Sequence, residues 1–158
     1  MVKHSQYIII NANIEKSWAF LIDLSRSLIF DKFYLRIELP GKYSINKNYA
    51  FNINAKYFFN NYKLKAEVKE VMAPSTFSIQ LIDKEILHNK NFILEALNNK
   101  TKLIYNFNGE FGGGLKNTII SPIIKISCIN EIRYIKKAIE SSEFYTNGEK
   151  INTVSSYK

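Results

Sequence analysis

Alternating apolar and polar residues run through the middle of the chain and predict a series of β-strands. The clearest segment is 62–68, where Leu64, Ala66 and Val68 alternate with lysines and a glutamate. A period of two places successive side chains on opposite faces of a sheet. The same period recurs over 33–39, 49–56, 77–81, 91–97 and 101–111. Because short turns join these segments, we expect an antiparallel meander with one buried face.

Helical patterns flank this meander. A first strand over 5–11 is followed by a helix over roughly 14–22, with Asn13 as its N-cap residue, and by a second short helix or turn over 24–31. After the glycines 112–114, residues 115–139 predict a long helix with two apolar stripes. One stripe contains Ile124, Cys128, Ile132, Ile135 and Ile139, and the other contains Leu115, Ile119, Ile123, Ile126 and Ile129.

The second stripe implies that the first half of the long helix is covered on two sides. Pro122 leaves two possibilities open: one long helix bent near the proline, or a short turn followed by a helix that begins there. We favour the single long helix. The alternative would place the two stripes on separate pieces.

Composition fits one domain with a real core, because 46% of the 158 residues are hydrophobic. We expect this domain to span 1–143 and a polar tail to follow over 144–158. The single cysteine, Cys128, excludes an internal disulfide, and its place on an apolar stripe predicts a buried thiol. No apolar run approaches the roughly 20 residues of a membrane span, nor that of a signal peptide, so we expect a cytoplasmic protein.

The net charge of +8 favours an acidic partner, whether anionic lipid headgroups, nucleic acid or an acidic ligand. The chain is also rich in Ile, Lys and Asn, a bias that an AT-rich genome would produce without any function, so a functional and a compositional origin of the charge both stay open. Lys63, Lys65 and Lys69 share one face of a predicted strand. A continuous basic patch there would favour a ribosome- or RNA-associated protein, whereas isolated lysines would only solvate the strand.

Several segments are similar to one known group of proteins. They are the opening YIIINANIEKSWAFLIDLS with Trp18, Leu21 and Asp23, the turn Pro40-Gly41, and FGGGLKN before the long helix. With these segments the chain resembles the START/Bet v 1-like (SRPBCC) superfamily, and within it the polyketide cyclase/dehydrase and lipid-transport group. Phe30 stands near a position where that group often has tryptophan.

The resemblance implies an α+β helix-grip fold, in which a curved, seven-stranded antiparallel sheet wraps around a long C-terminal helix. Two short helices would lie between strands 1 and 2. It also implies a hydrophobic cavity between sheet and helix that binds a lipid, isoprenoid quinone, polyketide or other apolar ligand. The residues we expect to line it are Phe51, Ile53, Ala66, Phe77, Ile79, Phe92, Leu94, Tyr105, Phe107, Leu115, Ile119 and Ile123. The alternative for each is to fill a solid core.

Motifs for catalysis or metal binding are not found, and we expect neither a metal nor a cofactor. We expect His4 and His88 on the surface, and the three glycines to form a strand-to-helix hinge rather than a phosphate loop. A cyclase or dehydrase would need a positioned acid or base in the cavity. The inward residues are almost all apolar, with Tyr105 as the main exception, and Glu95 and Glu110 are expected to face water. This favours binding over catalysis, with the enzyme as the alternative; the sequence does not decide the oligomeric state.

Overall fold

The computed structural model describes residues 1–41, 45–57 and 59–141. Its described part contains one antiparallel sheet in the order β1-β7-β6-β5-β4-β3-β2. The strands are β1 (Val2–Ile10), β2 (Tyr34–Glu38), β3 (Ala50–Tyr57), β4 (Asn60–Met72), β5 (Thr76–Ile82), β6 (Ile86–Leu97) and β7 (Lys100–Phe111). The helices are α1 (Ile14–Ile22), α2 (Leu24–Ser27), the 3-10 turn η1 (Leu28–Phe30) and α3 (Gly114–Glu140).

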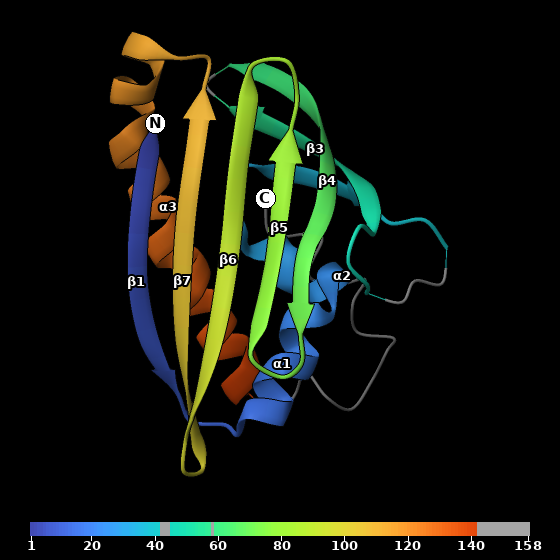
Figure 1. Ribbon diagram of the computed structural model, residues 1–158. Helices are drawn as coiled ribbons and strands as arrows, with labels where there is room; N and C mark the ends of the chain where they lie inside the picture. The colour runs from blue at the N-terminus through green and yellow to red at the C-terminus, as the bar shows by residue number, and fades with distance from the viewer. Residues whose placement is uncertain (42–44, 58, 142–158) are drawn as a thin grey trace.

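The arrangement confirms the predicted helix-grip fold. Strands β2 to β7 form a meander of antiparallel neighbours, and β1 pairs with β7 from Val2 opposite Gly109 to Ile10 opposite Thr101. Helix α3 passes behind β1, β7 and β6, while α1 and α2 lie near the lower end of the sheet (Figure 1). The interior between the sheet and these helices therefore holds the core and any site built within it.

Helix α1 begins and packs as the sequence predicts. The Asn13 side chain accepts a hydrogen bond of 2.9 Å from the backbone N–H of Lys16, which satisfies one of the free donors at the helix start. Trp18, Phe20 and Leu21 are buried in the core. This packing fixes α1, and with it the connection that leads through α2 and η1 into β2.

Strand β6 begins at Ile86, earlier than the predicted start at 91. Its polar first half pairs on both sides, with His88 opposite Leu81 of β5 and opposite Gly109 of β7. Two rows of backbone hydrogen bonds outweigh the weak strand propensity of this segment. Continuing the period of two backwards from Phe92 then places Lys90 and His88 on the inward face.

Helix α3 is continuous from Gly114 to Glu140 with Pro122 inside it, which confirms the single long helix. Gly112 and Gly113 precede it with φ angles of 69° and 74°, a conformation that side chains with a Cβ rarely adopt. Their conformation turns the chain from β7 into α3.

Only one of the two apolar stripes of α3 faces the sheet. Ile124, Cys128 and the later members of the first stripe are buried. The prediction that Leu115, Ile119 and Ile123 line the interior is wrong, because their exposed fractions are 75%, 55% and 41%. A helix that lies on a single sheet has one inward face, and no other described element covers the outer one.

The expected domain limits stay a prediction. The proposed domain limits of 1–143 and 144–158 are not tested, and the tail lies outside the described residues. Within the part of the chain that the structure describes, no helix has both the length and the apolar character needed to cross a membrane.

Substitutions on opposite sides of α3 test which stripe carries the core. We expect Ile124→Ala to lower the free energy of unfolding by about 2–5 kcal/mol, because it opens a cavity beneath a buried side chain. Ile126→Ala, the matched control on the exposed side, is expected to change it by less than about 0.5 kcal/mol. Urea denaturation measures both, and equal losses would contradict the assignment of the faces.

Candidate functional site: a charged cluster inside the core

The predicted lining residues divide into two groups in the structure. The nine on the sheet are all buried and belong to one continuous core: Phe51, Ile53, Ala66, Phe77, Ile79, Phe92, Leu94, Tyr105 and Phe107. The three on α3 lie on its outer face, as described above. Rings on β5, β6 and β7 stack across the sheet, with centroids 6.1 Å apart for Phe77 and Phe92 and 4.9 Å apart for Phe92 and Tyr105.

A buried lysine stands at the centre of this interior. Lys90 of β6 is fully buried, and its Nζ donates hydrogen bonds of 2.7 Å to Asp31 Oδ2 and 2.7 Å to Glu131 Oε1. The ammonium also lies 4.7 Å from the centre of the Tyr34 ring, a cation–π contact. An isolated charge would cost several kcal/mol in such a place, so the two carboxylates are what make it tolerable.

Three separate parts of the chain position this cluster. Asp31 follows η1, and its Oδ1 accepts a hydrogen bond of 2.9 Å from the backbone N–H of Phe33. Glu131 comes from the inward face of α3, where Tyr105 of β7 donates a 2.9 Å hydrogen bond to its Oε2. The cluster therefore ties the entry to β2, the middle of the sheet and the long helix together.

The cluster has perturbed proton affinities. Burial disfavours the charged form of Lys90, but the Asp31 and Glu131 carboxylates outweigh it and raise the pKa of the ammonium. Burial also raises the pKa of Glu131, although hydrogen bonds from Lys90 and Tyr105 oppose the rise. Cys128 is buried, which confirms the predicted buried thiol, and this burial raises its pKa to about 12 and makes it unreactive.

The expectation of a surface His88 is wrong. The imidazole is buried and lies among four aromatic rings, those of Tyr34, Tyr57, Phe107 and Phe111. Gly109 lies opposite it, where an added Cβ would be 2.9 Å from both His88 Cβ and the Phe107 ring. Burial, with a smaller contribution from Lys90, lowers the pKa of His88 to about 3, so the ring is neutral at pH 7.

Four buried polar atoms beside the charged cluster have no hydrogen-bond partner among the described residues. They are Nδ1 and Nε2 of His88 and the hydroxyl oxygens of Tyr34 and Tyr57. The rings that carry them are neighbours, with His88 centred 6.5 Å from Tyr34 and 6.1 Å from Tyr57. Leaving such a group unpaired costs about 1–3 kcal/mol. We call His88, Tyr34 and Tyr57 the unpaired polar group.

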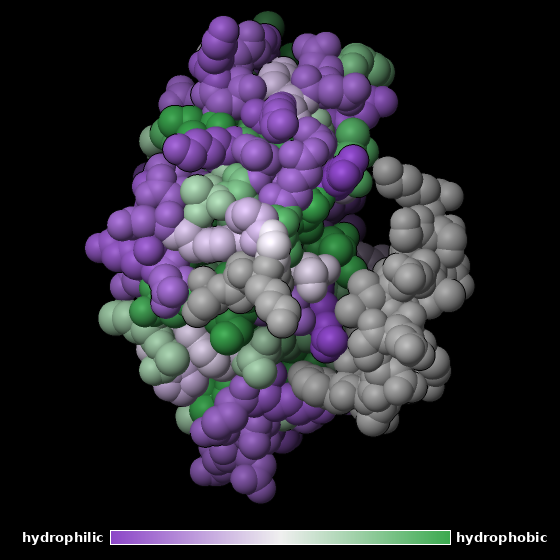
Figure 2. All heavy atoms as spheres, turned by 90° about the vertical axis from the view of Figure 1, so that its right-hand side faces the viewer, coloured by the Kyte–Doolittle hydropathy of each residue, from purple (hydrophilic) through white to green (hydrophobic). Residues whose placement is uncertain are grey.

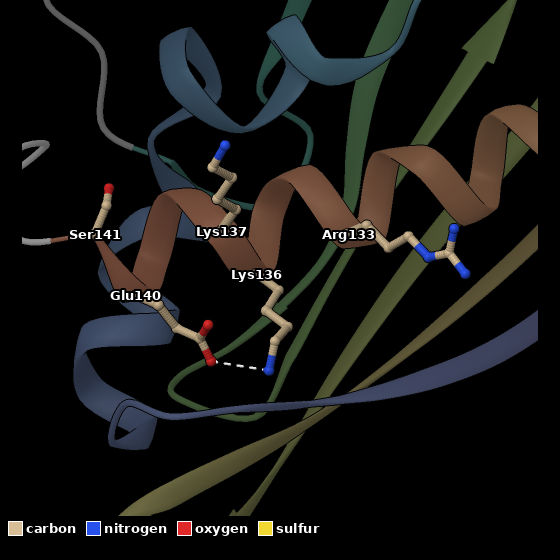
Figure 3. A pocket seen from close by; sticks show the side chains of 5 residues that line it. All are labelled: Arg133, Lys136, Lys137, Glu140 and Ser141. Carbon is tan, nitrogen blue, oxygen red and sulfur yellow. Dashed lines mark ion pairs between the residues drawn. The ribbon is translucent and has the colours of Figure 1, made fainter.

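Two hollows open on the surface, away from these residues. One, of about 480 Å³, lies on the last turns of α3 and is lined by Arg133, Lys136, Lys137, Glu140 and Ser141 (Figure 3). The other, of about 460 Å³, lies between the β5–β6 turn and the start of α3. Neither is lined by a residue predicted to bind ligand.

The other charged candidates face solvent. Glu95 and Glu110 are exposed, as expected. Lys63 pairs with Glu38 at 3.6 Å and Lys69 pairs with Glu67 at 2.8 Å, so carboxylates accompany two of the three lysines proposed for nucleic acid. Binding of RNA or the ribosome through this face stays a prediction.

Sequence reasoning missed most of the charged cluster. The polar character of the segment around Lys90 and His88 predicts a turn, although the period of two, extended back from Phe92, would have turned both inward. Glu131 lies between Cys128 and Ile135 of the buried stripe, three residues after one and four before the other. That spacing was the available signal. For Asp31, which follows a 3-10 turn, the sequence offered none.

Comparisons with known proteins give the fold. No family model matches the chain, and no curated protein matches its sequence. Among solved structures, a START superfamily protein from Mycobacterium smegmatis superposes with a TM-score of 0.64 at 12% identity, covering 87% of this chain and 94% of that one. A polyketide-cyclase-like protein from Corynebacterium glutamicum gives 0.56 at 16% identity, covering 87% and 88%.

A third match is an enzyme. Norcoclaurine synthase from Thalictrum flavum, in complex with dopamine and hydroxybenzaldehyde, gives a TM-score of 0.65 at 9% identity, covering 92% of this chain and 88% of that one. The protein thus has the helix-grip fold of the START/Bet v 1-like superfamily, which confirms the resemblance at the level of the fold. An enzyme, norcoclaurine synthase, and a polyketide-cyclase-like protein both have this fold.

Removing the central charge tests the cluster. We expect Lys90→Met to lower the free energy of unfolding by about 3–5 kcal/mol, because it leaves Asp31 and Glu131 buried without their cation. Lys102→Met, which breaks the exposed pair with Glu95, is the matched control and is expected to cost less than about 1 kcal/mol.

A second variant separates lost charge pairing from lost packing. Adding Asp31→Asn and Glu131→Leu to Lys90→Met removes the unpaired carboxylates, and we expect this triple variant to be more stable than the single one. Guanidinium unfolding curves measure the difference. A triple variant less stable than Lys90→Met would show that the carboxylates are not the cause.

His88 gives a pH-dependent stability with a definite sign. Its pKa is about 3 in the folded protein and near 6.5 when unfolded, so the unfolded chain binds the extra proton as pH falls through 6.5 towards 3. Stability is lost in that window, by about 2 kcal/mol at pH 5. We expect His88→Phe to remove this part of the acid sensitivity, measured by thermal unfolding at pH 7 and pH 5.

Proposed function

We propose that the protein binds a small hydrophobic molecule that carries a hydrogen-bonding group, in the interior between the sheet and α3. The observation that supports this most is the unpaired polar group at the centre of an apolar core. Folded proteins rarely leave several neighbouring buried polar atoms unpaired. A ligand hydroxyl or carbonyl would satisfy atoms that the chain itself does not.

The unpaired polar group favours an uncharged partner. A neutral imidazole donates one hydrogen bond and accepts another, and each tyrosine hydroxyl does both. The Lys90 charge is already matched by Asp31 and Glu131, so it does not call for an anion. Phe107 and Phe111 add ring surfaces that suit a planar or aromatic body. Phenols, quinones, polyketides and lipids with a hydroxyl group all meet this description.

Two further features support a ligand inside. Norcoclaurine synthase, which has the same fold, forms a complex with dopamine and hydroxybenzaldehyde, and both are aromatic molecules with polar substituents. Hydrophobic side chains also gather across the middle of the face that carries α2 and the β2–β3 edge, with hydrophilic ones above and below (Figure 2). An apolar molecule bound inside would separate core side chains that touch in the structure.

A pair of matched probes tests the role of the hydroxyl groups. We expect 2-naphthol to bind more tightly than naphthalene, and Tyr57→Phe to weaken 2-naphthol by about three- to tenfold while leaving naphthalene unchanged, since one hydrogen bond is lost. Fluorescence titration measures both. Tyr7→Phe is the control, because Tyr7 is exposed. Equal loss for both probes would assign the effect to packing.

Native mass spectrometry of the protein purified under mild conditions tests the proposal directly. We expect a stoichiometric adduct that solvent extraction releases and identifies as an apolar molecule with a hydroxyl or carbonyl group. A protein that carries no adduct and binds neither naphthalene nor 2-naphthol would contradict the proposal.

A cyclase- or dehydrase-type enzyme is the second candidate, favoured by the raised pKa of Glu131 beside Tyr105 and Lys90. A buried carboxyl with a raised pKa, held beside a hydroxyl and an ammonium, is a candidate general acid or base. Glu131→Gln separates the two candidates: an enzyme would carry its product in the wild type and its substrate in the variant. A binding protein would carry the same molecule in both.

A further inference from the structure

The outer face of α3 carries an apolar stripe that no described part of the chain covers. Leu115, Ile119, Ile123 and Ile126 are all exposed there, and Ile126 has an exposed fraction of 56%. Exposing four large aliphatic side chains side by side is unfavourable in water. The opposite stripe supplies the helix's contact with the core.

The stripe continues into basic residues along the same line of the helix. Leu115, Ile119, Ile126, Arg133 and Lys137 are spaced by four, seven, seven and four residues, so their side chains follow one narrow strip of the surface. The strip is apolar up to Ile126 and basic from Arg133 onwards. We call it the outer strip.

The charges around the outer strip are mostly free to meet a partner. Lys125, Arg133 and Lys137 make no salt bridge with any described residue, whereas Lys136 pairs with Glu140 at 2.9 Å. Figure 3 shows Lys136 and Lys137 pointing to different sides of the helix, and Lys136 donates a hydrogen bond to the backbone carbonyl of Ile9. The other acidic residue of α3, Glu131, is buried on the opposite side.

This combination selects the partner. A second copy of the chain docked through the same face would bring like charges together in a protein that already carries +8. An anionic lipid surface satisfies both halves of the strip, because aliphatic side chains enter the boundary of the acyl chains while lysine and arginine reach the phosphates. We propose that the outer strip of α3 docks the protein on an anionic membrane surface.

The membrane surface and the interior site use opposite faces of α3. Residues of the inward stripe touch the core, and those of the outer strip are exposed to solvent. The docking proposal therefore does not depend on the proposed ligand, and each can fail alone. Together they would place the interior site next to a membrane.

Flotation with vesicles tests the docking. We expect the wild-type protein to float with phosphatidylcholine vesicles that contain phosphatidylglycerol, and to stay in solution with phosphatidylcholine alone or at high salt. Replacing Leu115, Ile119 and Ile126 together with Gln should reduce partitioning about a hundredfold, since three aliphatic groups no longer enter the lipid. Reversing three basic charges together, by Lys125→Glu, Arg133→Glu and Lys137→Glu, should reduce partitioning at least about tenfold.

Matched controls exclude general effects of apolar and basic residues. The control variant replaces three exposed hydrophobic side chains of the sheet with glutamine: Leu35→Gln, Met72→Gln and Leu97→Gln. We expect it to leave partitioning unchanged. Circular dichroism confirms that each variant folds. Wild-type protein that does not float with anionic vesicles overturns the proposal, and sedimentation of that protein as a dimer would assign the strip to a second copy. Equal loss in the control variant would also overturn it.

Discussion

The ion cluster of Lys90 is the interaction on which the rest of the interior depends. A lysine ammonium in the middle of a sheet requires two carboxylates at hydrogen-bonding distance, and here they come from the residue after η1 and from α3. The helix can slide along the sheet only by leaving Glu131 and Lys90 unpaired. Hydrophobic contact has no preferred direction, so it tolerates such shifts. The hydrogen-bonded ion pairs do not tolerate them, because they require fixed distances.

The core therefore has an uneven character. Most of it is aliphatic and aromatic, yet its centre holds a matched set of charges with a neutral imidazole and two tyrosine hydroxyls beside it. The charged part is satisfied within the chain and the neutral part is not. A site of this kind recognises a polar group through hydrogen bonds while surrounding aromatic rings hold the rest of the molecule, as is usual in small-molecule sites.

Helix α3 serves two environments because its two stripes lie on opposite faces. On the inward face, Ile124 and Cys128 pack into the core and Glu131 binds Lys90 in the charged cluster. The outward face is aliphatic near its start and basic towards its end. A helix whose only role was to cover a sheet would be polar on its outer side, so the outer residues reflect a requirement separate from folding.

The order of elements, the meander and the long helix through Pro122 follow from the sequence alone, because periods of two and of about four are local properties that burial on one face imposes. The sequence also marked most of the sheet's inward side chains, including Tyr105. Only the tertiary structure decided which stripe of α3 meets the sheet, since both are equally apolar. The tertiary structure also brings Asp31, Lys90 and Glu131 together. These residues come from segments far apart in the chain, and His88 and Lys90 turn inward only because β6 pairs with strands on both sides.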